Sequence, residues 1–363
     1  MVDISVIIPV FNAEQFLRKS VQSVLQFEFI KEIILVDDYS TDNSLVICEE
    51  LSRKYNKIKV YRHPAGHNKG ASAARNFGIK MAKSEYLAFL DADDIYLPNR
   101  FGAEYNLLPN EYIDAVYGAL GIHYHTENGL KNFRKMKKKE LTTLAKYVAP
   151  QELKYVLVNM HTEFGGNNYF TLDTLTIKKS LVLAVGGFNE NLRVGEDNEF
   201  NIKISIKGRL IPGIIDKPIA LRGVHDNNTL LTRKPDPKHF VWSELEIWLQ
   251  TNVENEEKLK YWISKEKDLS LFIIENERKS FLRKVRNMKS LILKHPVIFF
   301  NYTDFRRIVI KTLGKGLIIK SLLRIKELII NIFFKDVLTK QFNNYYFTRS
   351  EKQLPPNSKL ISN

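Results

Sequence analysis

The chain has 363 residues, of which 44% are hydrophobic and 26% are charged, and its formal net charge is +14. This composition excludes a disordered chain, and the length allows one large domain with an appendage. The single cysteine, Cys48, cannot form an internal disulfide, so nothing in the sequence indicates an oxidising compartment.

The N-terminal residues begin directly with a strand pattern at Ile4. They lack the basic start, the apolar stretch and the small-residue cleavage site of a secretory signal. No uninterrupted apolar run reaches the roughly 18 residues that a membrane-spanning helix requires. We therefore predict a cytoplasmic protein without a transmembrane segment.

The first hundred residues alternate short apolar runs with amphipathic segments in a βαβα order. The predicted strands span residues 4–9, 33–36, 58–61 and 86–90. Nearly continuous apolar strands separated by helices indicate a parallel sheet that is covered on both faces. Such sheets bind ligands at the carboxyl ends of their strands. Because Asp37-Asp38 and the acidic residues at 91–94 both follow strands, we expect them to meet in one crevice.

The pattern becomes helical from about His239 onward and has few turn signals there. Two prolines, Pro235 and Pro237, interrupt the pattern just before this point. We therefore predict an α/β domain over residues 1–232 and a basic, mainly helical C-terminal region over residues 233–363. The net charge belongs to the second part, because residues 278–340 contain sixteen Lys and Arg against three acidic residues.

The triplet Asp91-Ala92-Asp93 places two carboxylates around a small spacer at the end of a predicted buried strand. Mg²⁺ and Mn²⁺ favour oxygen ligands and usually take only one or two carboxylates from a protein. An ion held in this way can act as a Lewis acid that neutralises the charge building up on a diphosphate leaving group. Acid-x-acid triplets are also common on ordinary surface loops, so on these residues alone a solvated loop remains an open alternative.

Four segments stand out in chain order, namely residues 5–12 (SVIIPVFN), 36–42 (VDDYSTD), 68–76 (NKGASAARN) and 89–94 (FLDADD). A fifth comprises residues 186–190 (GGFNE) and 195–197 (GED). Together these segments resemble the family 2 glycosyltransferases of the GT-A fold. The resemblance covers roughly residues 3–230 and implies a Rossmann-like, mostly parallel sheet flanked by helices. It also implies inverting transfer of a sugar from a nucleotide diphosphate sugar.

The resemblance implies which residues bind the donor. The set is Pro9, Phe11, Asn12, Asp38, Lys69, Arg75, Asp91 and Ala92. Within it, Asp91 is expected near the ribose, whereas Lys69 and Arg75 match a stretch that faces the base and the phosphates. Ordinary strand-end and packing roles remain open for Pro9 and Phe11.

The resemblance also implies a metal site for Mn²⁺ or Mg²⁺. Asp93 is expected on the metal ion. His225 lies in residues 222–228, which resemble a late segment where some family members place a histidine near the diphosphate or the metal. We include His225 among the predicted metal ligands, with a hydrogen-bonded structural histidine as the alternative.

Inverting transfer needs a carboxylate that deprotonates the acceptor hydroxyl as it attacks the sugar. The pair Glu196-Asp197 follows flexible glycines and leads into an amphipathic helix. On the residues alone, helix capping competes with catalysis, because carboxylates also suit a helix N-terminus. The resemblance favours Asp197 as the base and Glu196 as a supporting residue or a hydrogen-bonding partner of the acceptor.

The leading interpretation is a bacterial hexosyltransferase that uses a UDP-sugar, since UDP is the commonest nucleotide in the resembling family. The expected acceptor is a saccharide or a lipid-linked saccharide in cell-surface polysaccharide or glycolipid synthesis. A nucleotidyltransferase is an alternative, but it should show a Gly-rich phosphate loop where this chain has PVFN at residues 9–12. A non-catalytic nucleotide-binding scaffold is a second alternative, and its usual sign would be a lost metal ligand or base.

One C-terminal segment, residues 317–334, has a wide apolar face and a narrow polar stripe at helical spacing. The stripe consists of Lys320, Arg324, Glu327 and Asn331. This pattern resembles a helix lying in an anionic membrane surface, so we expect peripheral association with the inner face of the cytoplasmic membrane. Packing on the catalytic domain is the alternative. Nucleic acid is not expected as a partner, because the apolar face is too wide.

Overall fold

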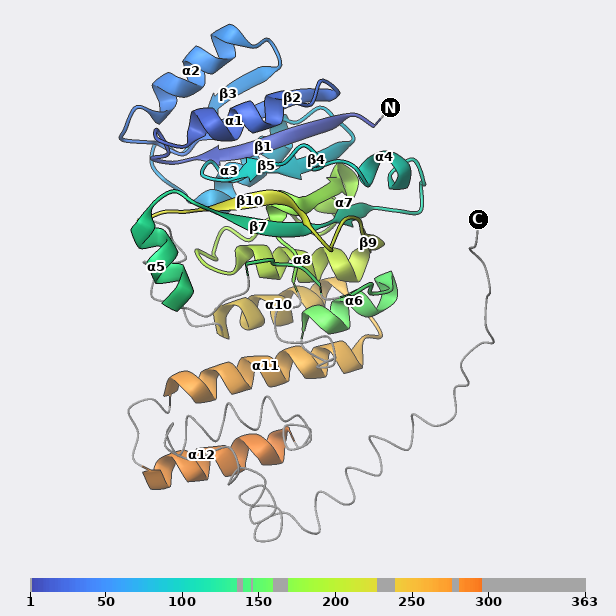
Figure 1. The fold of residues 1–363 in the computed structure, drawn as a ribbon. Helices are drawn as coiled ribbons and strands as arrows, with labels where there is room; N and C mark the ends of the chain where they lie inside the picture. Colours follow the sequence, from blue (N-terminus) through green and yellow to red (C-terminus); the bar gives the residue numbers. More distant parts are fainter. Residues whose placement is uncertain are drawn as a thin grey trace. The chain divides into compact units, whose positions relative to one another are not determined.

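The computed structural model describes residues 2–135, 140–144, 146–158, 169–226, 239–275 and 281–295. The chain separates into two compact units, residues 1–267 and 268–363 (Figure 1). The predicted boundary at residue 232 falls within residues 227–238, which lie outside the described residues, and it stays a prediction.

The first unit contains a seven-stranded sheet in the order β3-β2-β1-β4-β8-β6-β9. Its strands are β1 (Ile4–Val10), β2 (Ile30–Asp37), β3 (Ile58–Arg62), β4 (Tyr86–Phe89), β6 (Ala115–Tyr117), β8 (Leu175–Lys178) and β9 (Leu210–Pro212). The first four strands are parallel, whereas β8 runs antiparallel to β4 and β6. They are connected by α1 (Leu17–Leu25), α2 (Ser44–Lys54) and α3 (Ala71–Met81). The predicted α/β fold with a mostly parallel sheet is therefore confirmed.

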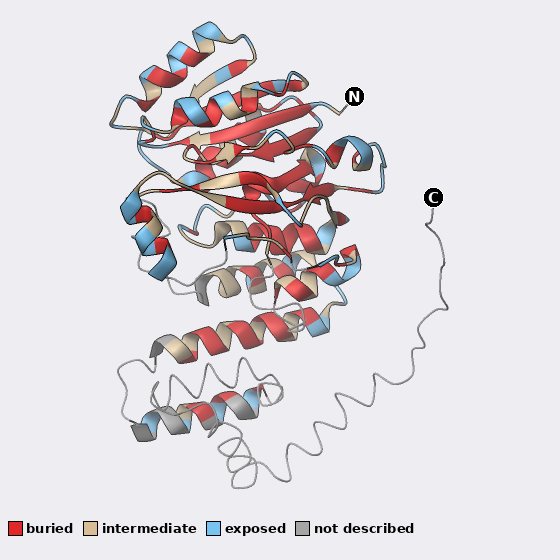
Figure 2. Cartoon of the chain, in the orientation of Figure 1, coloured by how far each residue is buried: buried red, intermediate tan, exposed pale blue. Residues whose placement is uncertain are grey.

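Both faces of this sheet are buried, as the strand pattern predicts. Side chains alternate along β1, so Val6 and Ile8 join one hydrophobic cluster whereas Ile7 joins the other. Leu17 of α1 lies in the first cluster, and Ala74 of α3 lies in the second. Figure 2 shows the burial of these strands. Because helices cover both faces, the carboxyl ends of the strands form the edge at which a ligand can bind.

A second, three-stranded sheet has the order β5-β10-β7. Its strands are β5 (Ile95–Tyr96), β7 (Ala119–Tyr124) and β10 (Pro218–Val224). Strands β7 and β10 lie side by side in parallel (Figure 1), with Val224 opposite Tyr124. The next residues of the two strands are His125 and His225, which therefore leave the sheet next to each other. The sequence did not predict this sheet.

The remaining helices of the described residues include several short ones and a helical C-terminal part. They are α4 (Glu104–Leu107), α5 (Glu127–Lys135), α6 (Pro150–Leu157), η2 (Leu172–Thr174), α7 (Lys179–Ala184), α8 (Glu196–Lys207), α10 (His239–Asn252), α11 (Glu257–Glu275) and α12 (Phe281–Lys294). Helix α10 packs against α8. None of the helices in the described ranges combines the length and the apolar character needed to cross a membrane. The predicted interfacial helix at residues 317–334 lies outside those ranges.

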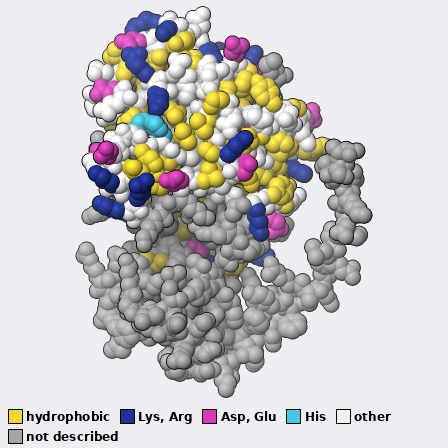
Figure 3. Space-filling model, viewed as in Figure 1, with side chains coloured by type: hydrophobic (Ala, Val, Ile, Leu, Met, Phe, Trp, Pro, Cys, Tyr) yellow, Lys and Arg dark blue, Asp and Glu magenta, His cyan; other side chains and the backbone are white. Residues whose placement is uncertain are grey.

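Charged side chains of both signs are spread over the described surface in view (Figure 3). No single basic patch dominates this face of the first unit. This distribution agrees with a sequence in which the excess of Lys and Arg lies beyond residue 277.

The guanidinium of Arg100 is a buried cross-link that connects η2, β8 of the main sheet and α4. It is fully buried and donates to the carbonyls of Asp173, at 2.8 Å, and Leu175, at 2.9 Å. It also forms an ion pair with Glu104 at 2.7 Å and donates to Thr176 Oγ1 at 3.3 Å. Burial raises the pKa of the Glu104 carboxyl, and the Arg100 charge opposes that rise. The ion pair therefore compensates a buried carboxylate next to η2, which carries Asp173, and β8, which follows it.

We expect Arg100→Met to lower the free energy of unfolding by about 3–5 kcal/mol, because it leaves a buried carboxylate without its cation. Urea denaturation measures the change, and Arg209→Met, at an exposed arginine, is the control. Adding Glu104→Met to Arg100→Met should restore part of the loss. A single variant as stable as the control would show that the ion pair is not needed.

Candidate active site

The ends of β1 and β2 are tied together at the carboxyl edge of the main sheet. The Asp38 amide donates to the Val10 carbonyl at 2.8 Å, and the Asn12 amide donates to Ser40 Oγ at 3.1 Å. Asn12 Oδ1 in turn accepts from the Thr41 amide at 2.8 Å. Asn12 has a left-handed φ of 49°, which asparagine tolerates better than most residues. Its side chain thus fixes the loop that follows β2.

Asp38 holds the loop that leads into α3. Its carboxylate accepts from the amides of Lys69, at 2.9 and 3.1 Å, and Gly70, at 2.7 Å, and the residue is only 2% exposed. Gly70 has a φ of 95°, a conformation that favours glycine. Lys69 itself is exposed. Two of the predicted donor-binding motifs are therefore joined through one carboxylate.

Pro9 and Phe11 differ in their surroundings. Pro9 is half-buried near the end of β1 and pairs with Val36 of β2, which leaves its predicted role in donor binding open. Phe11 is 48% exposed. An exposed aromatic ring at the carboxyl end of a parallel strand is available to stack on a planar ligand.

Tyr39, the residue after Asp38, has a left-handed φ of 61°. For a bulky side chain this conformation is unfavourable, and such residues cluster at functional sites. The Arg62 guanidinium lies 4.2 Å from the centre of the Tyr39 ring and 3.4 Å from a carboxylate oxygen of the buried Asp37. The sequence did not single out Tyr39 or Arg62, because a backbone angle leaves no signal in residue type.

The acidic loop after β4 is anchored by two buried carboxylates. The Asp91 amide donates to Asp173 Oδ1 at 3.0 Å, and the Gly223 amide donates to Asp94 Oδ1 at 2.8 Å. One carboxylate oxygen from each of Asp91, Asp94 and Asp173 lies within 4.8 Å of the others. Ala92, between the two predicted acids, is buried at 7% exposure. A third segment, which carries Asp173, therefore joins the acids that follow β4.

The carboxylates that support the loop, those of Asp94 and Asp173, are more deeply buried than those of Asp91 and Asp93. Asp94 and Asp173 are 2% and 3% exposed. Burial, followed by the charge of Asp173, raises the pKa of Asp94 well above its ordinary value. Burial, followed by the charge of Asp91, raises the pKa of Asp173 to about 6. Their hydrogen bonds to backbone amides make them structural supports of the loop rather than solvent-facing ligands.

The two predicted metal ligands meet although they are far apart in sequence. His225 Nε2 lies 3.2 Å from Asp93 Oδ2, and their side chains are 15% and 29% exposed. The rings of His125 and His225 lie 4.7 and 4.5 Å from the Phe16 ring. His125 Nε2 is also 3.4 Å from the Asp93 carbonyl oxygen. The sequence missed His125, because its position depends on the unpredicted second sheet.

Arg75 connects the acidic loop to the segment that carries the predicted base. It forms ion pairs with Asp91 at 2.7 Å and with Glu196 at 3.5 Å, and its side chain is 5% exposed. Burial alone lowers the pKa of Arg75, but Asp91 and Glu196 more than offset this, so the guanidinium stays charged. Burial, followed by Asp197, raises the pKa of Glu196. The predicted donor and acceptor sides are thus contiguous.

Asp197 lies in the first turn of α8 and is partly exposed. Its Oδ1 accepts from the Asn198 amide at 2.8 Å. Gly195, with a φ of 84°, is the N-cap residue, and no side-chain hydrogen bond caps this helix. Asp197 therefore accepts from one amide in the first turn of α8, so the capping alternative that the sequence left open stays open.

The mostly parallel sheet, with the acidic loop after β4 and the carboxylates at the start of α8, has the architecture of the GT-A fold. Residues 5–174 match the family model described as glycosyl transferase family 2. Residues 5–174 therefore form a domain of this family of glycosyltransferases.

Two relatives and one solved structure show the extent of the similarity. The chain is 36% identical over 132 residues to Glycosyltransferase GlyG of Streptococcus pneumoniae, covering 36% of this chain and 42% of GlyG. It is 30% identical over 241 residues to the minor teichoic acid biosynthesis protein GgaA of Bacillus subtilis, covering 63% of this chain and 49% of GgaA. The chain thus spans about half the length of these relatives.

The solved structure is that of S. aureus TarS residues 1–349 in complex with UDP-GlcNAc. It has a TM-score of 0.58 at 16% identity, over 95% of this chain and 93% of that chain. At this level of identity, the similarity establishes the fold alone.

Gly223 allows β10 to approach the acidic loop. A Cβ atom on this residue would lie 2.1 Å from the Asp93 carbonyl oxygen and 2.6 Å from His125 Nε2. Any larger residue must therefore displace the loop that carries Asp93. The sequence shows a glycine within residues 222–228, but it does not show that this glycine packs against the loop that carries Asp93.

We expect Gly223→Ala to lower the free energy of unfolding by about 1–3 kcal/mol, the usual cost of overpacking. Gly102→Ala is the matched control, because the nearest atoms to its added Cβ would be 3.4 Å away. Urea denaturation compares the two. Equal stability of both variants would contradict the close approach of β10 to Asp93.

Proposed function

We propose that the chain is an inverting glycosyltransferase that moves a sugar from a UDP-sugar to a hydroxyl of a saccharide or lipid-linked saccharide. The observation that carries the proposal is the Arg75 bridge between Asp91 and Glu196. This bridge links the acidic loop after β4 to the carboxylate-bearing start of α8, which supports donor and acceptor sides on neighbouring segments. Inverting transfer needs these two kinds of group on opposite sides of the reacting sugar.

Asp93 and His225 are the residues that we propose as ligands of a divalent ion. The Asp93 Oδ2 and His225 Nε2 atoms lie 3.2 Å apart, so both could contact one Mn²⁺ or Mg²⁺ ion, for which a carboxylate oxygen is a preferred ligand. When bound, the ion would supply Lewis-acid stabilisation of the diphosphate leaving group. Asp94 and Asp173 would hold the loop in place through their backbone hydrogen bonds.

Asp197 is the proposed base. Its carboxylate is partly exposed, so an acceptor hydroxyl can reach it. Glu196 is engaged with Arg75 and is therefore better suited to position the base segment than to take a proton. An attack by the deprotonated hydroxyl on the face opposite the diphosphate inverts the anomeric centre.

Two kinds of observation support the proposed donor and acceptor. One is the site itself, and the other is the ligands and pathways in the names of similar proteins. TarS, which shares the fold, was crystallised with UDP-GlcNAc, and the exposed Phe11 ring offers a surface for a planar base. GgaA is named for minor teichoic acid biosynthesis. These observations support a role in the synthesis of a cell-surface polymer or glycolipid. Peripheral membrane association through residues 317–334 remains part of the proposal.

We expect UDP to raise the thermal unfolding temperature more than GDP or dTDP, and only when Mn²⁺ is present, because a ligand that binds only the native state stabilises it. Asp93→Ala should abolish this metal-dependent shift. Asp216→Ala, at an exposed carboxylate outside the site, is the control. If no nucleotide shifts the wild type with metal present, the proposed donor site is wrong.

We expect Asp197→Asn to slow release of UDP from the best UDP-sugar by about 10²–10⁴-fold, the usual contribution of a general base. Binding of UDP should be unchanged, because Asp197 is on the acceptor side. Steady-state kinetics and calorimetry measure the two quantities, with Asp216→Asn as the control. A variant with wild-type turnover would exclude Asp197 as the base, and a wild type that binds UDP without turnover would favour the scaffold alternative.

A further inference from the structure

We propose that helix α10 is a positioning element of the reaction, which holds the segment 185–197 so that Asp197 faces the crevice. The inference rests on the proposed function, since it assigns a role relative to the proposed base. Helix α10 lies outside residues 5–174, which match the family model. The positioning residues that we assign are Glu244 and Trp248.

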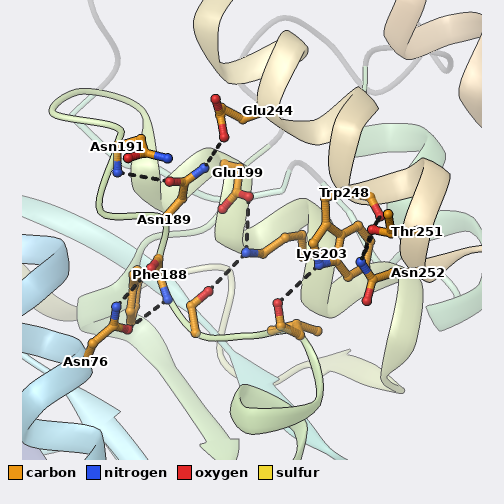
Figure 4. A network of polar contacts seen from close by, with 12 residues as sticks. Asn76, Phe188, Asn189, Asn191, Glu199, Lys203, Glu244, Trp248, Thr251 and Asn252 are labelled. Atoms are coloured by element: carbon orange, nitrogen blue, oxygen red, sulfur yellow. Dashed lines mark hydrogen bonds and ion pairs between the residues drawn. The ribbon is translucent and has the colours of Figure 1, made fainter.

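The segment begins with a turn at the end of α7, where the amides of Gly186 and Gly187 donate to the carbonyls of Leu183, at 3.1 Å, and Val182, at 3.0 Å. Gly186 and Gly187 have φ values of 81° and 68°, a region in which glycine is conformationally permissive. Trp248 of α10 donates its indole N–H to the Val185 carbonyl at 3.2 Å, directly before this turn (Figure 4). The first residue of the segment is therefore attached to α10.

A second attachment lies in the middle of the segment. Asn189 Nδ2 donates to Glu244 Oε2 of α10 at 2.8 Å. The other end of the Asn189 amide, Oδ1, accepts from the Asn191 amide at 2.9 Å. Figure 4 shows Asn189 between Glu244 and the backbone of Asn191. One amide side chain thus connects α10 to the loop that leads to α8.

A third contact lies immediately before the predicted catalytic pair. Gly195, the N-cap of α8, has a φ of 84°, and a Cβ atom added to it would lie 2.7 Å from Val241 Cγ2. Helix α10 therefore packs against the backbone of the residue that precedes Glu196. The glycine is required both for its backbone conformation and for this close approach.

The other side of the segment rests on α3 and α8. The Phe188 amide donates to Asn76 Oδ1 at 2.9 Å, and Asn76 Nδ2 donates back to the Phe188 carbonyl at 2.9 Å. Lys203 Nζ donates to the Gly187 carbonyl at 3.0 Å and pairs with the buried Glu199 at 3.1 Å. The segment is therefore clamped between these two helices and α10. Because the base must lie within hydrogen-bond reach of the acceptor hydroxyl, loss of one side of the clamp should lower turnover.

The test compares two loss variants, one rescue variant and one control, all in the full chain. Glu244→Ala removes the acceptor for Asn189, and Trp248→Phe removes the donor to Val185 while keeping an aromatic ring. Glu244→Gln retains an oxygen that can accept from Asn189 Nδ2. Gln250→Ala changes an exposed residue of the same helix.

Three quantities are measured for each variant. They are the affinity for UDP with Mn²⁺, the kcat and KM for UDP release from UDP-GlcNAc, UDP-glucose and UDP-galactose, and the hydrogen exchange of the amides at 185–198. We expect Glu244→Ala and Trp248→Phe to lower kcat by about 10- to 100-fold, as expected for a misplaced catalytic group. The affinity for UDP and the donor KM should stay unchanged, and exchange should accelerate only in this segment. Glu244→Gln and Gln250→Ala should behave as the wild type.

Three results would overturn the proposal or separate it from the proposed function. Unchanged kcat and exchange in both loss variants would mean that α10 does not hold the segment. A fall in UDP affinity that matches the fall in kcat would mean that α10 supports the whole fold, and the proposal would be wrong. If the wild type neither binds UDP nor releases it from any donor, the proposed function fails, whereas the exchange data still decide whether α10 holds the segment.

Discussion

The buried Arg75 guanidinium, flanked by Asp91 and Glu196, is the interaction on which the rest of the site depends. A charge with a 5% exposed side chain is costly unless it is compensated, and here two carboxylates from opposite sides of the crevice compensate it. Each carboxylate belongs to a different functional segment, one after β4 and one at the start of α8. The electrostatic requirement of one side chain therefore fixes the spacing between the proposed donor and acceptor sides.

The acidic loop is stabilised by the same kind of compensation. Asp94 and Asp173 are almost fully buried. Asp94 accepts a hydrogen bond from the Gly223 amide, and Asp173 accepts one from the Asp91 amide. An unpaired buried carboxylate would be strongly unfavourable, so these hydrogen bonds lock the loop to β10 and to η2. The more exposed Asp93 is then left on a rigid support. A residue that binds a metal ion needs such a support, because its side chain must be held in a fixed orientation.

The sequence predicted the parts of the molecule that follow from local patterns and missed those that follow from long-range pairing. Apolar runs predicted the first four strands, because that signal lies within a few residues. The second sheet was missed, since β5 has only two residues and β7 and β10 are about a hundred positions apart. His125 and Gly223, which lie next to or within that sheet, were therefore not assigned. The Asp93–His225 pair was predicted only through the family resemblance.

The segment 185–197 illustrates how the position of a proposed base can depend on a helix that contains no proposed catalytic residue. Gly186, Gly187 and Gly195 give the segment its turns and its close contacts, but glycine also loses the most conformational entropy on folding. Contacts from elsewhere must offset that loss if the segment is to have one conformation. Trp248 and Glu244 provide such contacts from α10, and both join groups that would otherwise need water as a partner. In the proposed function, a helix that follows the sheet domain in sequence is therefore part of the geometry that presents Asp197 to an acceptor.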